Sequence, residues 1–123
     1  MTCRLAVATL LYNRGMTGLE QQLSLNNEIL QQRLELGDSI DTPREVEHFS
    51  YFRSHAGAEK AASRLKDSGF EVHLDRRLLK TALLATKEAP VDLQTSNQLT
   101  KDVWIAVTES GGTYDGWGAE VVE

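Results

Sequence analysis

The side chains best suited to chemistry stand at alternate positions in one short segment. Glu71, His73 and Asp75 alternate with Val72 and Leu74, so a β-strand here would place the polar groups together on one face. Imidazole and carboxylate groups are competent ligands for zinc or iron. The same alternation is typical of the water-facing side of an antiparallel sheet. We favour that interpretation and keep a small-ligand or metal-binding module centred on these residues as the alternative.

The glycines near the end of the chain do not fit a phosphate-binding loop. Gly111 and Gly112 follow a predicted helix and precede a predicted strand, whereas a phosphate loop lies between a strand and the start of a helix. Gly116 and Gly118 lie within that strand, where glycine often marks a bulge. Cys3 is at the start of the chain, and no serine occupies a nucleophile-elbow motif. The sequence therefore predicts no catalytic residue, no cofactor and no metal, and hence not an enzyme.

The composition is that of one ordinary globular domain. The chain has 123 residues, of which 41% are hydrophobic, and a formal net charge of −5, so it is long enough for one hydrophobic core. Direct binding to nucleic acid is not expected, because cationic side chains supply most of that affinity and this chain has no basic block. A single cysteine excludes an intramolecular disulfide and favours a reducing compartment, the cytoplasm.

Residues 1–15 are predicted to be an N-terminal extension. Their apolar run, residues 5–12, is too short to span a membrane, and no small-residue cleavage site follows it, so no membrane association is expected. Met16 lies directly before Thr17 and Glu20, which have the spacing of a capping box at a helix start. We therefore interpret Met16 as the natural start of the chain.

A long amphipathic helix is predicted from Thr17 to a stop at Gly37. Its apolar side chains recur near helical spacing. They are Leu19, Leu23, Leu30 and Leu34, with Leu25, Ile29 and Leu36 widening the stripe. Residues 16–43 thus comprise this helix and a linker closed by Pro43. The stripe suits packing within the chain or pairing with a second copy, so a homo-oligomer is a further alternative.

Residues 44–123 are predicted to form the order β-α-β-β-α-β. Strands are expected at residues 46–52, 70–75, 78–86 and 117–121. Arg76-Arg77 is the predicted turn between the two middle strands. Two helices are predicted between the strands: Gly69 ends the one before the second strand, and Pro90 with Asp92 opens the one before the last strand. This order predicts an α+β fold, a ferredoxin-like two-layer sandwich with the N-terminal helix as an addition.

Three short motifs make the chain resemble a known family. They are Val46-Glu47-His48-Phe49, Gly69-Phe70-Glu71-Val72 and Tyr114-Asp115-Gly116-Trp117-Gly118. Over residues 19–122 the chain is similar to the regulator of ribonuclease E activity B (RraB) family, and the last motif is the most specific. The resemblance implies a ferredoxin-like sandwich and a non-enzymatic protein. It also implies a protein partner, a ribonuclease E-type endonuclease that the protein binds and inhibits, which slows RNA turnover.

The candidate residues for contact with such a partner are Glu47, His48, Tyr114, Asp115 and Trp117. Tyr and Trp are enriched at interface hot spots, although strands usually bury alternate residues. We expect Trp117 in the core, and Glu47, His48 and Asp115 on the surface.

Overall fold

The computed structural model describes the backbone of residues 4–6 and the whole of residues 18–123. The helices are α1 (Gly18–Glu35), α2 (His55–Asp67) and α3 (Leu93–Glu109). The strands are β1 (Arg4–Ala6), β2 (Arg44–Phe52), β3 (Glu71–Arg76), β4 (Thr81–Ala89) and β5 (Thr113–Glu120). From β2 onward the elements follow the predicted β-α-β-β-α-β order, and the α+β class is confirmed.

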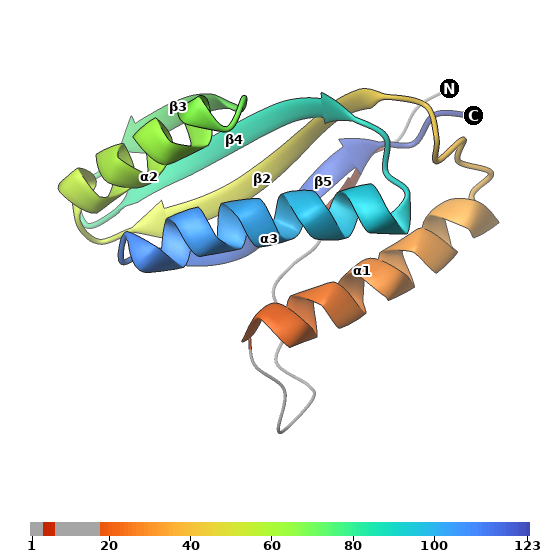
Figure 1. Ribbon diagram of the computed structural model, residues 1–123, viewed down its shortest axis with the longest axis horizontal. Coiled ribbons are helices and arrows are strands. Elements are labelled where there is room, and N and C mark those ends of the chain that lie inside the picture. Colours follow the sequence, from red (N-terminus) through yellow and green to blue (C-terminus); the bar gives the residue numbers. More distant parts are fainter. Residues whose placement is uncertain (1–3, 7–17) are drawn as a thin grey trace.

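The strands form one antiparallel sheet in the order β1-β5-β2-β4-β3. Helices α2 and α3 cover one face of this sheet, and α1 lies beside α3 (Figure 1). β3 and β4 form a hairpin, whereas β2 and β5 are neighbours although they are far apart in the sequence. The sheet therefore has an inner face under the helices and an outer face that helices α1 to α3 leave uncovered.

The inner face of the sheet and the facing helices form the hydrophobic core. Along β2, buried positions alternate with more exposed ones, as expected for a strand with one face in the core. Val46 and Phe52 of β2 belong to the same buried cluster as Val103 of α3. Helix α2 contributes the small apolar stripe Ala58, Ala61, Ala62 and Leu65. These small side chains let α2 approach the sheet closely.

The hairpin between β3 and β4 differs from the sequence prediction. Arg76 belongs to β3, β4 begins only after Lys80, and Leu78 and Leu79 form the tip rather than the start of a strand. The backbone N–H of Arg77 donates to the carbonyl of Lys80 across this turn, at 2.8 Å. Leu78 is 97% exposed and Leu79 is 83% exposed. The prediction was wrong because apolar residues in the turn continue the apolar pattern of the following strand.

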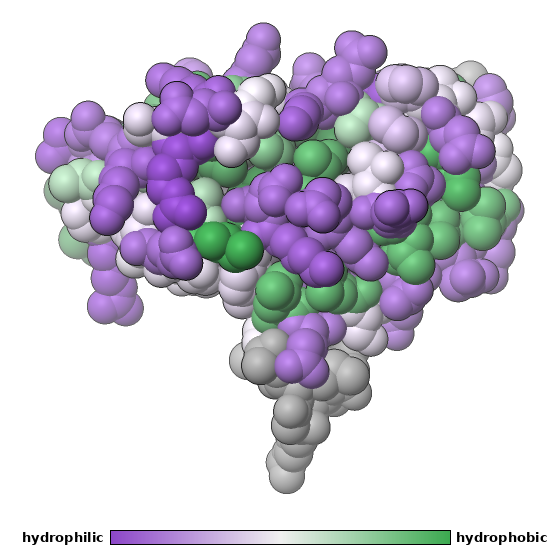
Figure 2. All heavy atoms as spheres, in the orientation of Figure 1, coloured by the Kyte–Doolittle hydropathy of each residue, from purple (hydrophilic) through white to green (hydrophobic). Residues whose placement is uncertain are grey.

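Helix α1 buries only part of the predicted apolar stripe. Its buried residues are Gln22, Leu25, Asn26, Ile29 and Arg33. The leucine stripe lies beside this face: Leu34 is 48% exposed, and Figure 2 shows hydrophobic patches at the surface over α1. The prediction is confirmed for Leu25 and Ile29. It was wrong for the other leucines because the neighbours of α1 offer hydrogen-bonding groups, and Asn26 donates to the hydroxyl of Thr100 on α3 at 3.1 Å. Polar side chains with partners are thus buried in place of leucines.

Two predictions about the N-terminal region fall outside the described residues. Residues 1–3 and 7–17 are not described, and these include both Met16 and Thr17 of the capping box. Within the predicted extension, Arg4–Ala6 forms β1 and pairs with β5. Among the described helices, none is long and apolar enough to cross a membrane.

Candidate functional site

The predicted surface position of His48 is wrong. Its side chain lies on the inner face of the sheet, and the residue is 1% exposed. The Nδ1 atom of His48 and the hydroxyl of Tyr114 form a 2.8 Å hydrogen bond. The His48 ring meets the Phe70 ring edge-on, with the ring centres 6.1 Å apart. Burial in this apolar setting lowers the pKa of His48 to about 3, so the imidazole is neutral near neutral pH.

Tyr114 and Trp117 lie in the core beside His48. Each is 2% exposed, and burial raises the pKa of the Tyr114 hydroxyl. The indole Nε1–H of Trp117 donates to Oδ1 of Asn26 at 2.8 Å, which connects β5 to α1. The guanidinium of Arg33 lies 5.4 Å from the centre of the Trp117 ring, within cation–π range. The core position predicted for Trp117 is confirmed.

Asp115 reaches the surface through a β-bulge. Phe49 of β2 pairs with Gly116, but Ser50 pairs with Tyr114, so Asp115 is an extra residue in β5. Gly116 has a φ angle of +121°, a conformation that glycine adopts without strain. The bulge keeps Tyr114 in the core and leaves Asp115 exposed, which is the surface position predicted for it.

The outer face of the sheet has an apolar centre. One residue from each of β3, β4, β2 and β5 lies in a row across this face. These residues are His73, Leu84, Phe49 and Gly116, in that order. Phe49 and Leu84 are partly exposed there. A hollow of about 440 Å³ opens over them, and Asp115 is among its lining residues. An apolar hollow bordered by polar groups suits an apolar side chain of a partner protein.

Carboxylates gather at one end of the outer face, where β2 begins. They belong to Glu45, Glu47, Glu71, Glu88 and Glu120. Glu47 lies on this face and is partly exposed, in line with its predicted surface position. Glu45 and Glu88 are direct cross-strand partners, an arrangement of like charges that destabilises a sheet. Such an acidic surface attracts a cationic partner.

The geometry does not support the alternative metal site. Glu71, His73 and Asp75 share the outer face of β3 and are exposed to water. Within the part of the chain that the structure describes, no group of three or more histidine, cysteine or carboxylate side chains could hold a metal ion. The carboxylate of Asp75 instead pairs with Arg77 at 2.9 Å. The alternation in β3 is therefore that of a water-facing strand.

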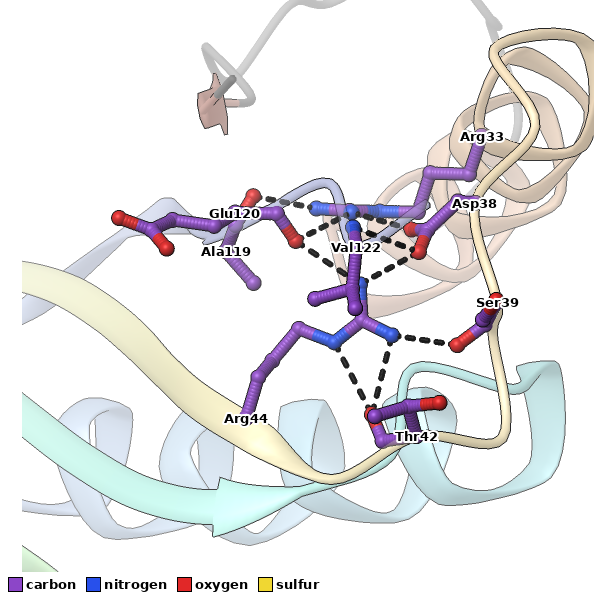
Figure 3. Close-up of polar contacts among 8 residues, drawn as sticks. All are labelled: Arg33, Asp38, Ser39, Thr42, Arg44, Ala119, Glu120 and Val122. Carbon is purple, nitrogen blue, oxygen red and sulfur yellow. Dashed lines mark hydrogen bonds and ion pairs between the residues drawn. The ribbon is translucent and has the colours of Figure 1, made fainter. Parts of the chain in front are cut away.

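Sequence reasoning missed a buried charged cluster that joins α1 to the sheet. Arg33 of α1 and Arg44 of β2 both bind the carboxylate of Asp38, at 2.8 Å and 2.6 Å respectively (Figure 3). Arg33 also donates to the backbone carbonyl of Ala119 at 2.9 Å, and Arg44 to that of Glu120 at 2.8 Å. The cluster thus fastens the linker and α1 to the end of β5. The charged residues next to Gly37 and Pro43 in the linker were the available signal.

The ionisation of Asp38 depends on this cluster. Burial by itself raises the pKa of the carboxyl group, but hydrogen bonds from Arg44, Arg33 and the backbone N–H of Val122 together outweigh it. The net effect is a pKa below the ordinary value for aspartate. The carboxylate therefore stays ionised between the two guanidinium groups.

Comparison with known proteins points to one family. A family model described as regulator of ribonuclease activity B matches residues 24–119, whereas no curated protein matches the chain. The matched residues begin within α1 and end within β5. They include the inner core, the bulge at Asp115 and both ends of the outer face. The chain belongs to the regulator of ribonuclease activity B family.

Proposed function

We propose that this protein binds a ribonuclease E-type endonuclease and inhibits it, which slows RNA turnover. The observation that carries the proposal is the family match over residues 24–119, because it extends from within α1 to within β5 and so includes most of the described elements. The net charge of −5 supports contact with a protein rather than with RNA, since phosphates require cationic side chains. In this proposal the protein acts in the cytoplasm by contact alone and catalyses no reaction.

We infer that residues 44–123 have the ferredoxin-like arrangement. The order β5-β2-β4-β3, with α2 and α3 on one face, supports this inference. In such an arrangement the outer face of the sheet is available to a partner. Residues 16–43 then add α1 beside α3, held by the Arg33–Asp38–Arg44 cluster.

Glu47 and Asp115 are the proposed contact residues on the outer face. Glu47 belongs to the acidic end, and Asp115 borders the hollow over Phe49. The buried candidates His48, Tyr114 and Trp117 would contribute indirectly, because their packing fixes the bulge that exposes Asp115.

The test uses purified protein and a purified ribonuclease E-type endonuclease. We expect direct binding by calorimetry and a lower initial rate of cleavage of a fluorogenic RNA. The double variant Glu47→Lys/Asp115→Lys should bind more weakly and inhibit less, because it reverses charge on the proposed contact surface. The matched control, Glu59→Lys/Asp67→Lys, makes the same change in net charge at exposed positions of α2. Absence of both binding and inhibition by the unaltered protein would overturn the proposal.

A further inference from the structure

We propose that the outer face of the sheet is also a self-association surface, on which a second copy of this chain docks face to face with reversed strand direction. On the β3–β4 side of this face, one end is acidic, the centre is apolar, and the other end carries a cationic tip with two exposed leucines. Asp115 of β5 is exposed on the same face and lines the same hollow as the tip residue Lys80. A surface with this order of properties is complementary to itself when one copy is turned end over end.

The cationic tip is the β3–β4 hairpin, residues 76–80. Its sequence is Arg76-Arg77-Leu78-Leu79-Lys80. Arg77 and Lys80 line the hollow on the outer face, and Arg77 also pairs with Asp75. Arg76 is the cross-strand partner of the buried Thr81, so it lies on the inner face of the sheet. The ammonium of Lys80 lies 5.4 Å from the ring centre of Tyr51 on the outer face. The tip thus joins the outer face directly, and its two leucines are almost fully exposed.

The acidic end supplies the complementary charge. Glu45 of β2 and Glu88 of β4 stand directly opposite one another, and neither forms an ion pair with any residue in the described ranges. Glu71 lies at the same end of β3. Like charges that face each other across a sheet are unfavourable unless a cation approaches them from outside. The tip of a second copy provides such cations together with an apolar anchor.

The symmetry of the sheet makes both contacts form at once. We consider a two-fold axis that lies between the two facing sheets, perpendicular to their strands. Such an axis places each strand opposite the same strand of the second copy, with the strand direction reversed. The β3–β4 tip of one copy then lies over the β3–β4 end that carries Glu71 and Glu88 in the other. The Phe49 and Leu84 centres of both copies meet near the axis. Every contact occurs twice, which is the definition of an isologous interface.

The available area suits a weak dimer. β2 has nine residues, and strands β5, β2, β4 and β3 make the outer face about 30 Å long and about 20 Å wide at ordinary strand spacings. Two such faces would bury about 1,200 Å² in total, the lower limit for specific protein–protein interfaces. We therefore expect an equilibrium that depends on concentration rather than a permanent dimer, and one that salt weakens.

Self-association and the proposed nuclease contact would exclude each other. A second copy on the outer face covers Glu47 and Asp115, the proposed contact residues for the nuclease. This consequence rests on the proposed function, whereas the dimer itself does not. The decisive experiment therefore contains no nuclease, so that failure of one proposal leaves the other intact.

The experiment measures molar mass by sedimentation velocity over a wide concentration range. Two variants are designed as a pair: Glu45→Lys/Glu88→Lys makes both ends of the face cationic, and Arg77→Glu/Lys80→Glu makes both ends acidic. All four positions are exposed, and circular dichroism verifies that the fold is kept. We expect dimerisation of each variant alone to weaken by more than about tenfold, because like charges meet at both ends.

A mixture of the two variants provides the strongest test. Each variant has the charge that the other lacks, so equal amounts should form a heterodimer that neither forms alone. Replacing both leucines, Leu78→Ser/Leu79→Ser, should also weaken the wild-type dimer, whereas the α2 control Glu59→Lys/Asp67→Lys should not. A wild-type protein that stays monomeric at every concentration would overturn the proposal. Variants that dimerise alone as tightly as the wild type, or a mixture that dimerises no better than either variant alone, would also overturn it.

Discussion

Replacing Asp38 tests the importance of the buried charged cluster. In Asp38→Asn the side chain keeps its shape but loses its charge, and Asp38→Ala removes the acceptor oxygens altogether. The carboxylate accepts hydrogen bonds from Arg33 at 2.8 Å, Arg44 at 2.6 Å and the N–H of Val122 at 3.1 Å. The side chains of Arg33 and Asp38 are fully buried, and that of Arg44 is 5% exposed. Either change leaves buried guanidinium groups without this carboxylate.

The expected loss follows from this burial. Removing one partner of a buried ion pair typically costs about 3–5 kcal/mol, because the remaining charge stays out of water. The guanidinium groups keep their backbone carbonyl acceptors, such as Ala119 for Arg33 and Ser39 for Arg44, so we expect the lower half of that range for Asp38→Asn. Domains of this size are stable by about 5–15 kcal/mol. The loss is therefore a large fraction of the total, and we expect the variant to remain folded but with a much lower urea midpoint.

The assay is urea unfolding followed by circular dichroism, with Asp41→Asn as the matched control. Asp41 lies in the same linker and is exposed, so its replacement should leave the free energy of unfolding nearly unchanged. The pKa of Asp38 is lower in the folded state than in the unfolded chain. The ionised carboxylate therefore contributes fully to the free energy of unfolding at pH values above the ordinary pKa of 3.8, and this contribution is lost as the pH falls through the lower pKa of the folded state. The difference between wild type and Asp38→Asn should accordingly shrink only below about pH 3.8. A loss below about 1 kcal/mol, the range of an exposed ion pair, would refute this reasoning.

Three further predictions concern the core beside the bulge. Trp117→Phe should lower the free energy of unfolding by about 1–3 kcal/mol in urea unfolding, because it leaves the buried Oδ1 of Asn26 without the indole donor; an unchanged midpoint would contradict this. Gly116→Ala should cost about 1–3 kcal/mol in the same assay, since its φ of +121° strains any other residue, and an equally stable variant would show that the bulge can relax. Burial lowers the pKa of His48 to about 3, so protonation favours the unfolded chain and stability should fall as the pH drops from about 6.5 towards 3. NMR signals of the His48 ring should show no titration near pH 6.5, and an inflection there would disprove the neutral buried state.

The sequence was most informative where local chemistry decides the conformation. Asp92 caps α3, and its carboxylate accepts from the backbone N–H of Thr95 at 3.0 Å, as its position before an apolar repeat suggested. Gly69 has a φ of +93° directly after α2, where it was expected to end the helix. The alternation around Val72 and Leu74 placed β3 with the correct face outward. Caps, stops and period-two patterns depend on neighbours within a few residues, so the sequence contains them.

The sequence could not predict which residues become buried where segments distant in the chain pack together. The leucines of α1 formed the clearest apolar stripe, yet the helix buries Asn26 and Arg33. Their hydrogen-bond partners, Thr100 on α3 and Asp38 in the linker, become neighbours only in the folded chain. A surface position was likewise predicted for His48, because its hydrogen-bond partner, Tyr114, is distant in the sequence.

The sequence by itself determined the element order, the α+β class, the family and the exposed position of Asp115. Only the tertiary structure decided which side of α1 is buried, where the β3–β4 turn places Leu78 and Leu79, and that Arg33, Asp38 and Arg44 share one buried site. It also brought the carboxylates of Glu45 and Glu88 together at one end of the outer face. The physical reason is that a polar or charged group can be buried only where another group satisfies it, and strand pairing selects that group from far along the chain.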